Sequence, residues 1–568
     1  MGPAAAGYRR VRRLGSGVLF IAGLIDVISA VTPPARGRLM FVDEFLPLAV
    51  PQIATVLVAM SGLALMLLSR GVRKGQRLAW NLAMVVLGAS AVLHLLKAAD
   101  VEEGIITALV AVYLGINSRA FRASGDRDSL QRGLVTMLFG GGVALLAGVA
   151  GVESYHRSTR PPLGRAFLVV AERLVGIYTT PLRAGHGGHF DRFVAPALTA
   201  VGVGLLAYLL VLAMRPVVLS HRPPAADLGR AREIVRRWGG DTLAYFALRD
   251  DKRWWFSGDS VVAYAVIGGI CLVSPDPVGP PEERSAVWTA FHRFADDHGW
   301  PVAVMAAGAE WLPVYEAAGM RDLYVGDEAV VDCQTFSLEG GQMKGLRQAV
   351  NRIAKYGYRM EFYDPARVGP ELRAELREVM AEQRRGDAER GFSMTLGRIF
   401  DPDDRGLLLA VAYGPEGAPV GLCHYVPAPG INGYSLDLMR RTDGPHPNGL
   451  IDFVVVRTIE HLRSMGMNGL GLNFATMRAV LAGETGDGMT QRVERWFLRR
   501  MSDTMQIESL WKYNAKFGPA WRARYAVYDS PEHMLPAALA VARAESWFEL
   551  PVIGRFLTPD TEEVPAGR

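Results

Sequence analysis

Apolar residues gather in six long stretches within the first part of the chain. The stretches lie near residues 15–31, 45–69, 78–97, 104–118, 133–152 and 194–214. A helix needs about 20 mostly apolar residues to cross a bilayer, and the fourth stretch is the shortest of the six. The pattern predicts a multi-pass α-helical membrane bundle of about six helices over residues 1–220.

Two polar features modify this prediction. Residues 161–183 contain a short apolar run, but Arg165, Glu172 and Arg173 interrupt it. Because charges at mid-helix cost a few kcal/mol each, we interpret this segment as an amphipathic helix on the outer face. Asp26 lies inside the first stretch, where an ionisable side chain is expected to be either paired or functional.

The pattern changes after residue 220, where short strand-like runs alternate with amphipathic helices. Strands are predicted at 243–248, 260–266, 269–273 and 301–305, with helices at 227–238 and 282–298. A similar series follows, with strands at 406–413, 418–426, 432–438 and 469–473 and a helix at 450–465. A basic helix, 344–355, separates the two series. We therefore expect two related α/β halves in one domain over residues 221–550, followed by a tail at 551–568.

The distribution of charge supports this division and predicts an orientation. Residues 1–220 hold 22 Lys and Arg against 11 Asp and Glu, whereas the rest of the chain holds 40 against 46. Arginine and lysine precede the first apolar stretch and fill the loops after the second and fourth. Since basic loops stay in the cytoplasm, six spans would place both termini and the α/β domain inside the cell.

The sequence lacks the motifs of several common metal sites and enzyme classes. Cys271, Cys333 and Cys423 are far apart and show no metal spacing, so we interpret them as buried or free thiols. The chain has no phosphate-binding Gly-Lys-Ser/Thr loop, zinc-protease motif or nucleophile elbow. His186 and His189 form a His-Gly-Gly-His loop, which suits a weak metal site or a solvated loop.

Polar residues concentrate at the end of one predicted strand. Asp437, Arg440 and Arg441 are followed by Asn448 and Gly449, which open a predicted helix. The start of a helix favours anions, and two guanidinium groups there would suit a phosphate. An equally simple interpretation is a solvated strand end in which Asp437 pairs with an arginine.

A second polar cluster mixes aromatic and cationic residues. It runs from Glu508 through Trp511, Lys512 and Lys516 to Arg522 and Arg524. Such a cluster could contact nucleic acid or lipid headgroups, or it could be a core stripe with lysines that reach the surface.

These residues carry a family resemblance. The segments 437–453, 469–473 and 510–525 resemble the phosphatidylglycerol lysyltransferase, or aminoacyl-phosphatidylglycerol synthase, family, as do the earlier segments 276–279, 326–329 and 346–352 in the same order. The resemblance covers roughly residues 235–545. The chain departs from the family in its smaller membrane part, in Pro275 where glycine is usual, and in lacking an overall basic excess for tRNA in its second part.

The resemblance implies a tandem acyltransferase-like (GNAT-type) fold and a specific reaction. It implies transfer of an aminoacyl group, lysyl or alanyl, from aminoacyl-tRNA to the glycerol hydroxyl of phosphatidylglycerol. The reaction would occur at the cytoplasmic face of the cell membrane and lower the negative charge of the bilayer. Because one ester replaces another, the step itself needs no ATP, metal or cofactor, only positioning, a proton acceptor and help for the oxyanion.

The resemblance also implies site residues. Asp437 and Arg440 lie at the expected catalytic centre, where Asp437 would hold the substrate ammonium or hydroxyl and Arg440 would bind lipid phosphate or the forming oxyanion. The other residues expected to bind substrate are Arg441, Asn448, Asn473, Glu494, Lys512, Lys516, Arg522 and Arg524.

Two other functions fit the same pattern. One is a membrane-anchored acyltransferase or peptidyltransferase that acts on a cell-wall precursor, although no glycine-rich pyrophosphate loop favours the CoA-dependent version. The other is a non-catalytic membrane lipid carrier or scaffold. The presence of Asp437, Arg440 and Lys512 together favours an enzyme.

Overall fold

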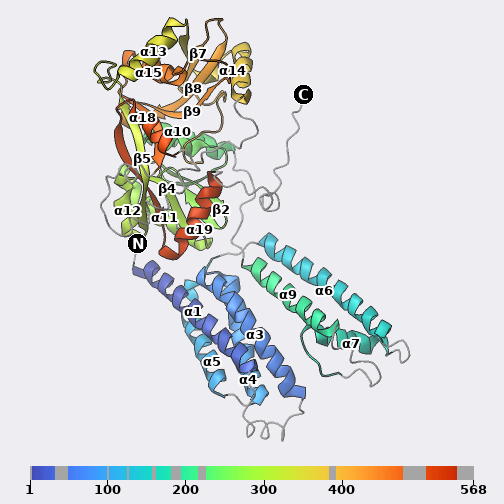
Figure 1. The fold of residues 1–568 in the computed structure, drawn as a ribbon. Helices are drawn as coiled ribbons and strands as arrows, with labels where there is room; N and C mark the ends of the chain where they lie inside the picture. Colours follow the sequence, from blue (N-terminus) through green and yellow to red (C-terminus); the bar gives the residue numbers. More distant parts are fainter. Residues whose placement is uncertain are drawn as a thin grey trace. The chain divides into compact units, whose positions relative to one another are not determined.

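The computed structural model describes residues 3–31, 49–98, 101–123, 127–155, 161–180, 194–214, 225–382, 392–476 and 507–545. The chain divides into two compact units near residue 220, with residues 293–300 grouped with the first unit. The first unit is helical and the second contains a large mixed sheet (Figure 1).

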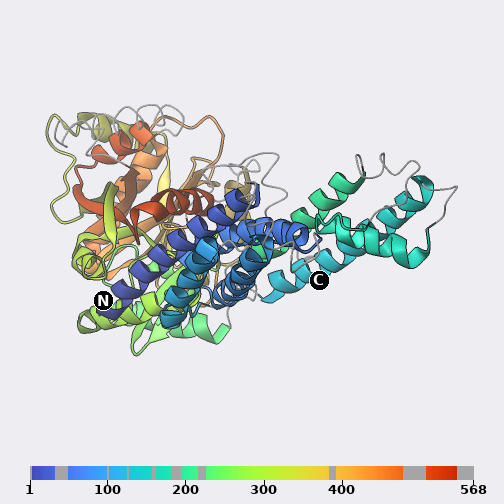
Figure 2. The ribbon, with the colours of Figure 1, turned by 90° about the horizontal axis from the view of Figure 1, so that it is seen from below.

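Helices make up the first unit. They are α1 (Pro3–Val31), α3 (Ala49–Arg73), α4 (Arg77–Ala98), α5 (Val101–Ile116), η1 (Ser118–Ala120), α6 (Arg127–Tyr155), α7 (Leu163–Leu174) and α9 (Ala195–Ala213). Helices α1, α3, α4 and α5 run alongside one another, and α6, α7 and α9 form a second group (Figure 2). Leu19, Leu65 and Leu114 belong to the fully buried core of the first group.

Five of the helices in the described part of the chain are long and apolar enough to cross a membrane: Arg10–Ala30, Ile53–Arg73, Arg77–Leu96, Leu130–Ser154 and Ala195–Ala213. They correspond to five of the six predicted stretches. The remaining stretch, 104–118, forms α5. Its 16 residues span about 24 Å, less than the roughly 30 Å of a hydrocarbon core. The fourth stretch therefore forms a helix that is shorter than the other five and lies beside α4 and α1.

The interrupted segment after α6 forms α7. Its 12 residues are too few to cross a bilayer, as its charges predicted. Arg173 is 2% exposed and donates hydrogen bonds to the backbone oxygens of Ile177 and Thr180, while Glu172 accepts from Thr179 and Thr180. The two charges thus stabilise the turn that ends this helix.

Glycines let α1 and α3 approach closely. A β-carbon at Gly23 would lie 2.6 Å from the carbonyl oxygen of Gly62, and one at Gly62 would lie 2.5 Å from the carbonyl oxygen of Gly23. Small residues at a crossing point allow this backbone contact, which stabilises helix pairs in membranes through close packing.

Asp26 is paired inside the bundle. It is fully buried, and both of its oxygens bond to side chains of α4: Oδ2 accepts from Ser90 Oγ at 2.6 Å, and Oδ1 lies 2.9 Å from His94 Nε2. The contact links α1 to α4. Of the two expectations for Asp26, the structure shows the paired one.

Eleven strands of the second unit form a single sheet. The strands are β1 (Arg253–Ser257), β2 (Ser260–Ile267), β3 (Ile270–Val273), β4 (Val302–Gly308), β5 (Arg321–Asp332), β6 (Arg359–Tyr363), β7 (Leu408–Tyr413), β8 (Pro419–Ala428), β9 (Gly433–Arg441), β10 (Gly469–Thr476) and β11 (Ala520–Tyr528). Their order is β1-β2-β3-β4-β11-β5-β10-β9-β8-β7-β6. Of the strand pairs in the described part of this unit, only β3/β4 and β9/β10 are parallel.

The sheet contains two halves with the same topology. Strands β1, β2 and β3 are antiparallel, and a helix then leads to the parallel strand β4. Strands β7, β8 and β9 followed by β10 repeat this order. The final strands of the two halves are exchanged. Strand β5, which follows β4 in sequence, pairs with β10 of the second half, and β11, which follows β10, pairs with β4 of the first half. The predicted tandem acyltransferase-like halves are confirmed, and the exchange joins them into one sheet.

Helices cover both faces of this sheet. They are α10 (Ala225–Trp238), η3 (Ala244–Leu248), η4 (Pro281–Glu283), α11 (Arg284–Asp297), η5 (Ala309–Trp311), α12 (Leu312–Ala317), α13 (Lys344–Lys355), η6 (Pro365–Arg367), α14 (Pro370–Glu382), η7 (Pro429–Ile431), α15 (Leu450–Ser464), α18 (Ile507–Ala515) and α19 (Pro531–Ala544). In the second half, α13 and α15 pack on one face and α14 on the other (Figure 1).

We name the two sheet faces by what packs on them. The α15 face carries Cys423, Tyr425 and Leu436 against α13 and α15. The opposite face, the α14 face, carries Leu422 and Leu438 against α14, and it continues through Val426 to the core that α10 and η3 cover.

Most predicted elements lie where the pattern placed them, and one was wrong. The run 243–248 was predicted as a strand but forms the 3-10 helix η3, whose five residues are all buried. A short continuous apolar run is compatible with either structure, so only its packing decides. The three cysteines are buried and free, as expected.

The close α1–α3 crossing generates a prediction. Gly23→Leu should force the two helices apart, because its side chain has no space beside the Gly62 backbone, and overpacking typically costs about 1–3 kcal/mol. We expect a melting temperature several degrees lower for the detergent-purified protein. Gly17→Leu is the matched control, since a β-carbon there meets nothing within 4 Å. Equal melting temperatures for the two variants would contradict the crossing.

Candidate active site

Asp437 is placed by an irregularity in the sheet. Strands β8 and β9 pair His424 with Leu438 and Tyr425 with Leu436, so Asp437 is an extra residue on β9. Such a bulge turns the side chain of the extra residue relative to its neighbours. The carboxylate is 1% exposed and reaches residues on the α14 face.

His424 is the partner of this carboxylate. Its Nδ1 lies 2.6 Å from Asp437 Oδ2, and both side chains are fully buried. The other carboxylate oxygen, Oδ1, accepts the backbone N–H of Leu396 at 2.7 Å. His424 Nε2 has no hydrogen-bond partner among the described residues. A carboxylate that orients one ring nitrogen while the other has no hydrogen-bond partner is an arrangement found in general bases.

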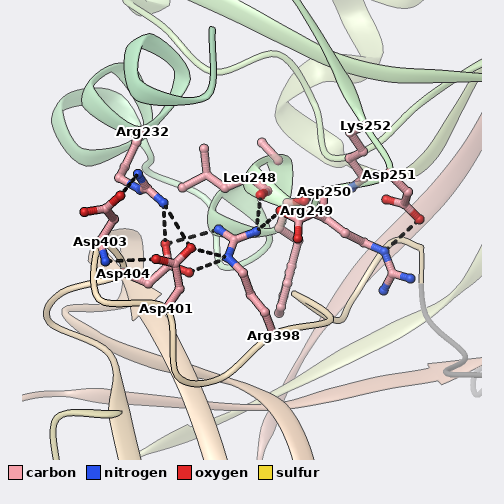
Figure 3. A network of polar contacts seen from close by, with 12 residues as sticks. Arg232, Leu248, Arg249, Asp250, Asp251, Lys252, Arg398, Asp401, Asp403 and Asp404 are labelled. Carbon is pink, nitrogen blue, oxygen red and sulfur yellow. Dashed lines mark hydrogen bonds and ion pairs between the residues drawn. The ribbon is translucent and has the colours of Figure 1, made fainter. Parts of the chain in front are cut away.

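The segment that donates to Asp437 is fixed by a network of ion pairs (Figure 3). Arg398 Nε lies 2.6 Å from Asp404 Oδ2, and Arg398 Nη1 lies 2.6 Å from Asp250 Oδ1. Arg232 of α10 also reaches Asp404, at 3.1 Å. These contacts hold the backbone near Leu396 in the position that Asp437 requires.

Arg524 lies in a second buried cluster on the same face of the sheet. Its Nη2 lies 2.6 Å from Asp241 Oδ1 and 2.5 Å from Glu328 Oε2, and it donates to Thr242 Oγ1 at 2.7 Å. Burial favours a lower pKa for Arg524, but Asp241 and Glu328 outweigh burial and hold its pKa well above the usual value. Burial favours a higher pKa for Asp241, yet Arg524 lowers it.

Two further buried groups have pKa values near neutrality. Burial raises the pKa of Asp276 to about 7, although hydrogen bonds from Gly308 N and Tyr315 Oη oppose the change. Burial lowers the pKa of Lys252 to about 7; its Nζ donates to the carbonyl oxygens of Phe246 and Ser274 at 2.9 and 2.7 Å. Both groups link segments of the first half of the sheet through these hydrogen bonds.

The remaining cations surround the start of α15. Arg440 is half-buried and faces the α14 side, because it pairs with Leu422, and it donates to the carbonyl oxygen of Met439 at 3.0 Å. Arg441 and Asn448 are exposed beside this helix start. Arg352 of α13 donates to the carbonyl oxygen of Asn448 at 3.0 Å.

Lys512 of α18 and Lys516, just after the end of that helix, add two lysines to this region. Lys512 is exposed, and Lys516 lies 3.4 Å from Asp452 in the first turn of α15. Gly449, which precedes α15, has φ of 104° and lies against Ala349 of α13, where a β-carbon would be 2.7 Å away. The local backbone therefore requires glycine, and it brings α13 and α15 together.

The structure separates the predicted site residues. Asp437 and Arg440 share the α14 face, whereas Arg441, Asn448, Lys512 and Lys516 belong to the surroundings of the α15 start. Arg522 is exposed on β11, opposite Glu328. Asn473 lies in β10, but its side chain is outside the described part, as are Glu494 and the His186–His189 loop.

Arg524 requires a correction. It was expected to bind substrate, but it is 3% exposed, and Asp241, Thr242 and Glu328 occupy its guanidinium. The mixed pattern of aromatic and cationic residues in β11 arises because alternate residues of the strand face opposite sides of the sheet, so Arg524 meets buried carboxylates.

His424 and Glu328 are two buried polar residues that the sequence pattern did not single out. His424 is a lone histidine within an apolar strand, and no spacing connects it to Asp437. Glu328 lies within one of the family-like segments, but nothing in that segment indicates that its carboxylate is buried.

A pocket of about 450 Å³ lies away from these residues. It is lined by the loop from Asp332 to Met343 together with Phe517 and Gly518, and it contains none of the predicted site residues. Among the described residues, no group of three or more His, Cys, Asp or Glu could hold a metal ion.

The fold and the buried dyad define a class: a membrane protein with a tandem acyltransferase-like domain. Residues 232–528 match the family described as phosphatidylglycerol lysyltransferase, C-terminal. The chain belongs to this family.

Curated relatives that match almost the whole chain have names that agree with this family. The lysylphosphatidylglycerol biosynthesis bifunctional proteins LysX of Mycobacterium marinum and Nocardia farcinica are 30% and 32% identical over 97% of this chain. The chain spans about half the length of the curated relatives it matches, 50% of each of these two. The solved structure of L-PGS from Bacillus licheniformis is 25% identical, with a TM-score of 0.50, and the match covers 56% of this chain and 97% of that one.

The buried Arg524 cluster predicts a large effect on stability. Arg524→Met should leave Asp241 and Glu328 buried without their cation, which typically costs about 3–5 kcal/mol. We expect a markedly lower melting temperature for the full-length protein. Arg522→Met, which changes an exposed arginine two residues earlier in the same strand, is the control and should melt close to the wild type. If both variants melt alike, Arg524 does not hold the sheet together.

Lys252 predicts a pH dependence of stability. Its folded pKa of about 7 is below the ordinary value of 10.5, so between pH 7 and 10 the unfolded chain binds the proton more tightly. The contribution of Lys252 to the free energy of unfolding therefore increases as the pH rises from 7 to 10. Lys252→Met should remove the rise, measured as melting temperature at pH 7 to 10, whereas Lys355→Met on the exposed side of α13 should keep it. Parallel curves for the wild type and Lys252→Met would contradict the prediction.

Proposed function

We propose that this protein transfers an aminoacyl group from aminoacyl-tRNA to the glycerol hydroxyl of phosphatidylglycerol. The observation that carries the proposal is the buried Asp437–His424 pair, in which Nε2 has no hydrogen-bond partner among the described residues, inside a domain that matches the phosphatidylglycerol lysyltransferase family. Of the lysyl and alanyl groups, the lysyl group is favoured, because the curated relatives and the matching family carry lysyl names.

The reaction exchanges one ester for another. The glycerol oxygen attacks the acyl carbon of the donor and forms a new C–O bond, while its proton passes to a base. The tetrahedral intermediate then breaks the bond to the ribose oxygen of the tRNA, which takes a proton as it leaves. Atoms balance without an oxidant or an added cofactor. The protein must supply the base, the alignment and stabilisation of the oxyanion.

His424 is suited to be the base in this scheme. Asp437 accepts from Nδ1 and fixes the ring, so that Nε2 takes the proton from the glycerol hydroxyl and returns it to the leaving ribose oxygen. Both Asp437 oxygens are occupied, by His424 and by Leu396 N. We therefore assign Asp437 to positioning His424, in place of the direct substrate contact expected from the sequence.

Arginine and lysine residues are suited to the anionic parts of the substrates. Arg440 lies on the same face as the dyad and is proposed to stabilise the oxyanion or bind the lipid phosphate. Arg441, Asn448 and Lys512 are proposed to hold a phosphate at the start of α15, where backbone N–H groups favour anions. Lys516, Arg522, Asn473 and Glu494 stay proposed substrate contacts.

The donor would meet a local basic surface. Helix α13 carries Lys344, Arg347, Arg352 and Lys355 and no acidic residue. Arg352 and both lysines are exposed. Phosphate contacts from such a helix would bind tRNA without a basic excess over the whole domain.

The bilayer supplies the acceptor. Attachment to membrane helices raises the local concentration of lipid near the catalytic domain. We propose that the domain faces the cytoplasm, because the loops after α3 and at η1 are rich in arginine and lysine and aminoacyl-tRNA is found there.

Lipid analysis tests the function directly. Expression of the full chain in a bacterial host without aminoacylated lipids should yield phosphatidylglycerol whose mass is raised by one aminoacyl residue, lysyl first among those expected. His424→Gln and Asp437→Asn should each lower the yield at least a hundredfold, the usual scale for losing general-base catalysis. Mass spectrometry of extracted lipids measures both results.

Glu416→Gln is the control, because this glutamate is exposed on the turn between β7 and β8 and should leave the yield unchanged. Full yield from His424→Gln would remove the proposed base. Absence of any new lipid, with the protein present in the membrane, would instead favour a peptidyltransferase acting on a cell-wall precursor or a non-catalytic carrier.

A further inference from the structure

One buried carboxylate oxygen has no hydrogen-bond partner in the described part of the chain. Glu328 is 2% exposed, and its Oε2 accepts from Thr242 Oγ1 at 2.8 Å and from Arg524. Its Oε1 accepts from no described residue. A buried oxygen of an ionised carboxylate is costly to leave without a donor, so this atom indicates a ligand that brings one.

The unpartnered oxygen and a hydroxyl flank the same backbone position. A β-carbon at Gly471 would lie 3.4 Å from Glu328 Oε1 and 2.9 Å from Ser435 Oγ. Ser435 is itself 2% exposed. A side chain at position 471 would therefore crowd Ser435 Oγ and lie against Glu328 Oε1, and glycine avoids both contacts.

The strands diverge at this point. Strand β9 pairs with β10 only at Gly433–Ser435 and Gly469–Gly471, and the register of β10 against β5 shifts between Gly471 and Phe474. Backbone irregularities of this kind redirect side chains next to functional sites. Glu328 and Ser435 thus lie where the parallel pair of the second half ends.

The charge around Glu328 is unbalanced. Among the described residues, Arg524 donates to Glu328, and Asp241 takes two of the hydrogen bonds of that guanidinium. Arg522, which pairs with Glu328 across the strands, is exposed. Arg524 also donates to Thr242 and approaches the carbonyl oxygen of Ala306. Two carboxylates therefore share one cation, and a further cation would balance the second.

A primary ammonium fits this site better than a metal ion. It brings three N–H donors, and Glu328 Oε1 and Ser435 Oγ can each accept one. The described residues contain no group of three or more side chains suited to a metal. In the proposed reaction, the ammonium is supplied by the aminoacyl group.

We propose that Glu328 and Ser435, beside Gly471, bind the ammonium of the aminoacyl donor. This inference deepens the proposed function and rests on it for the identity of the ligand. Ser435 and Asp437 are two residues apart on β9, or roughly 7 Å along a strand, and His424 lies on the same face. An ammonium held at Ser435 would place the ester carbonyl toward His424 Nε2.

Direct binding tests the site apart from lipid transfer. Isothermal titration of the detergent-purified full chain with lysinamide, alaninamide and Nε-acetyl-lysinamide should show binding of at least one. Comparison of the three identifies whether the α- or the ε-ammonium is held. Glu328→Gln and Ser435→Ala should weaken that binding roughly tenfold to a hundredfold, the range for a hydrogen bond to a charged group.

Gly471→Ala gives an independent variant that keeps every charge. Its methyl group would crowd Ser435 Oγ and should abolish measurable binding, while Gly345→Ala on α13, where nothing lies within 4 Å, should bind like the wild type. A melting curve for each variant excludes unfolding. Unchanged affinity in Glu328→Gln and Gly471→Ala, or no amine binding at all, overturns the site even if the lipid product forms. Affinity that falls as expected without any lipid product would retain the site and remove the proposed acceptor.

Discussion

The buried ion pair of Arg524 with Asp241 and Glu328 is the contact on which the second unit depends. It joins the last strand, β11, to β5 and to the segment before η3, residues that are 196 and 283 positions away in sequence. Without it, the exchanged strands would bring carboxylates into the sheet with no cation to neutralise them. The cost of a buried, unpaired charge thus selects the single arrangement in which both halves share a sheet.

The exchange of β5 and β11 also explains where the polar residues meet. Each half alone would end at its parallel strand pair, but the inserted strand brings Glu328 to the second half and Arg524 to the first. The two buried clusters, around Arg524 and around His424, therefore occupy one face of a continuous sheet. Irregular pairing supports both, because Asp437 is an extra residue on β9 and β4 bends at Ala306, a non-glycine residue with φ of 56°.

In the first unit, a different constraint selects the structure. Apolar helices gain little from burying apolar surface against one another in lipid, so close backbone contact and polar pairs decide their packing. Gly23 and Gly62 provide the contact between α1 and α3, and Asp26 with Ser90 and His94 provides the polar pair between α1 and α4. Helix α1 thus supplies a residue to both contacts: Gly23 to the close backbone contact and Asp26 to the polar pair.

Hydrophobic periodicity by itself determined the division into membrane and α/β units, most strand and helix positions, and the repeat of the two halves, because these depend on local residue patterns. The cluster from Asp437 to Gly449 was also evident, since polar residues gather there at the end of a strand. Only the tertiary structure showed that His424 pairs with Asp437, that Arg524 is buried, and that one oxygen of Glu328 has no partner among the described residues. Those contacts depend on a strand bulge and on strands exchanged across some 200 residues, and no local spacing encodes either.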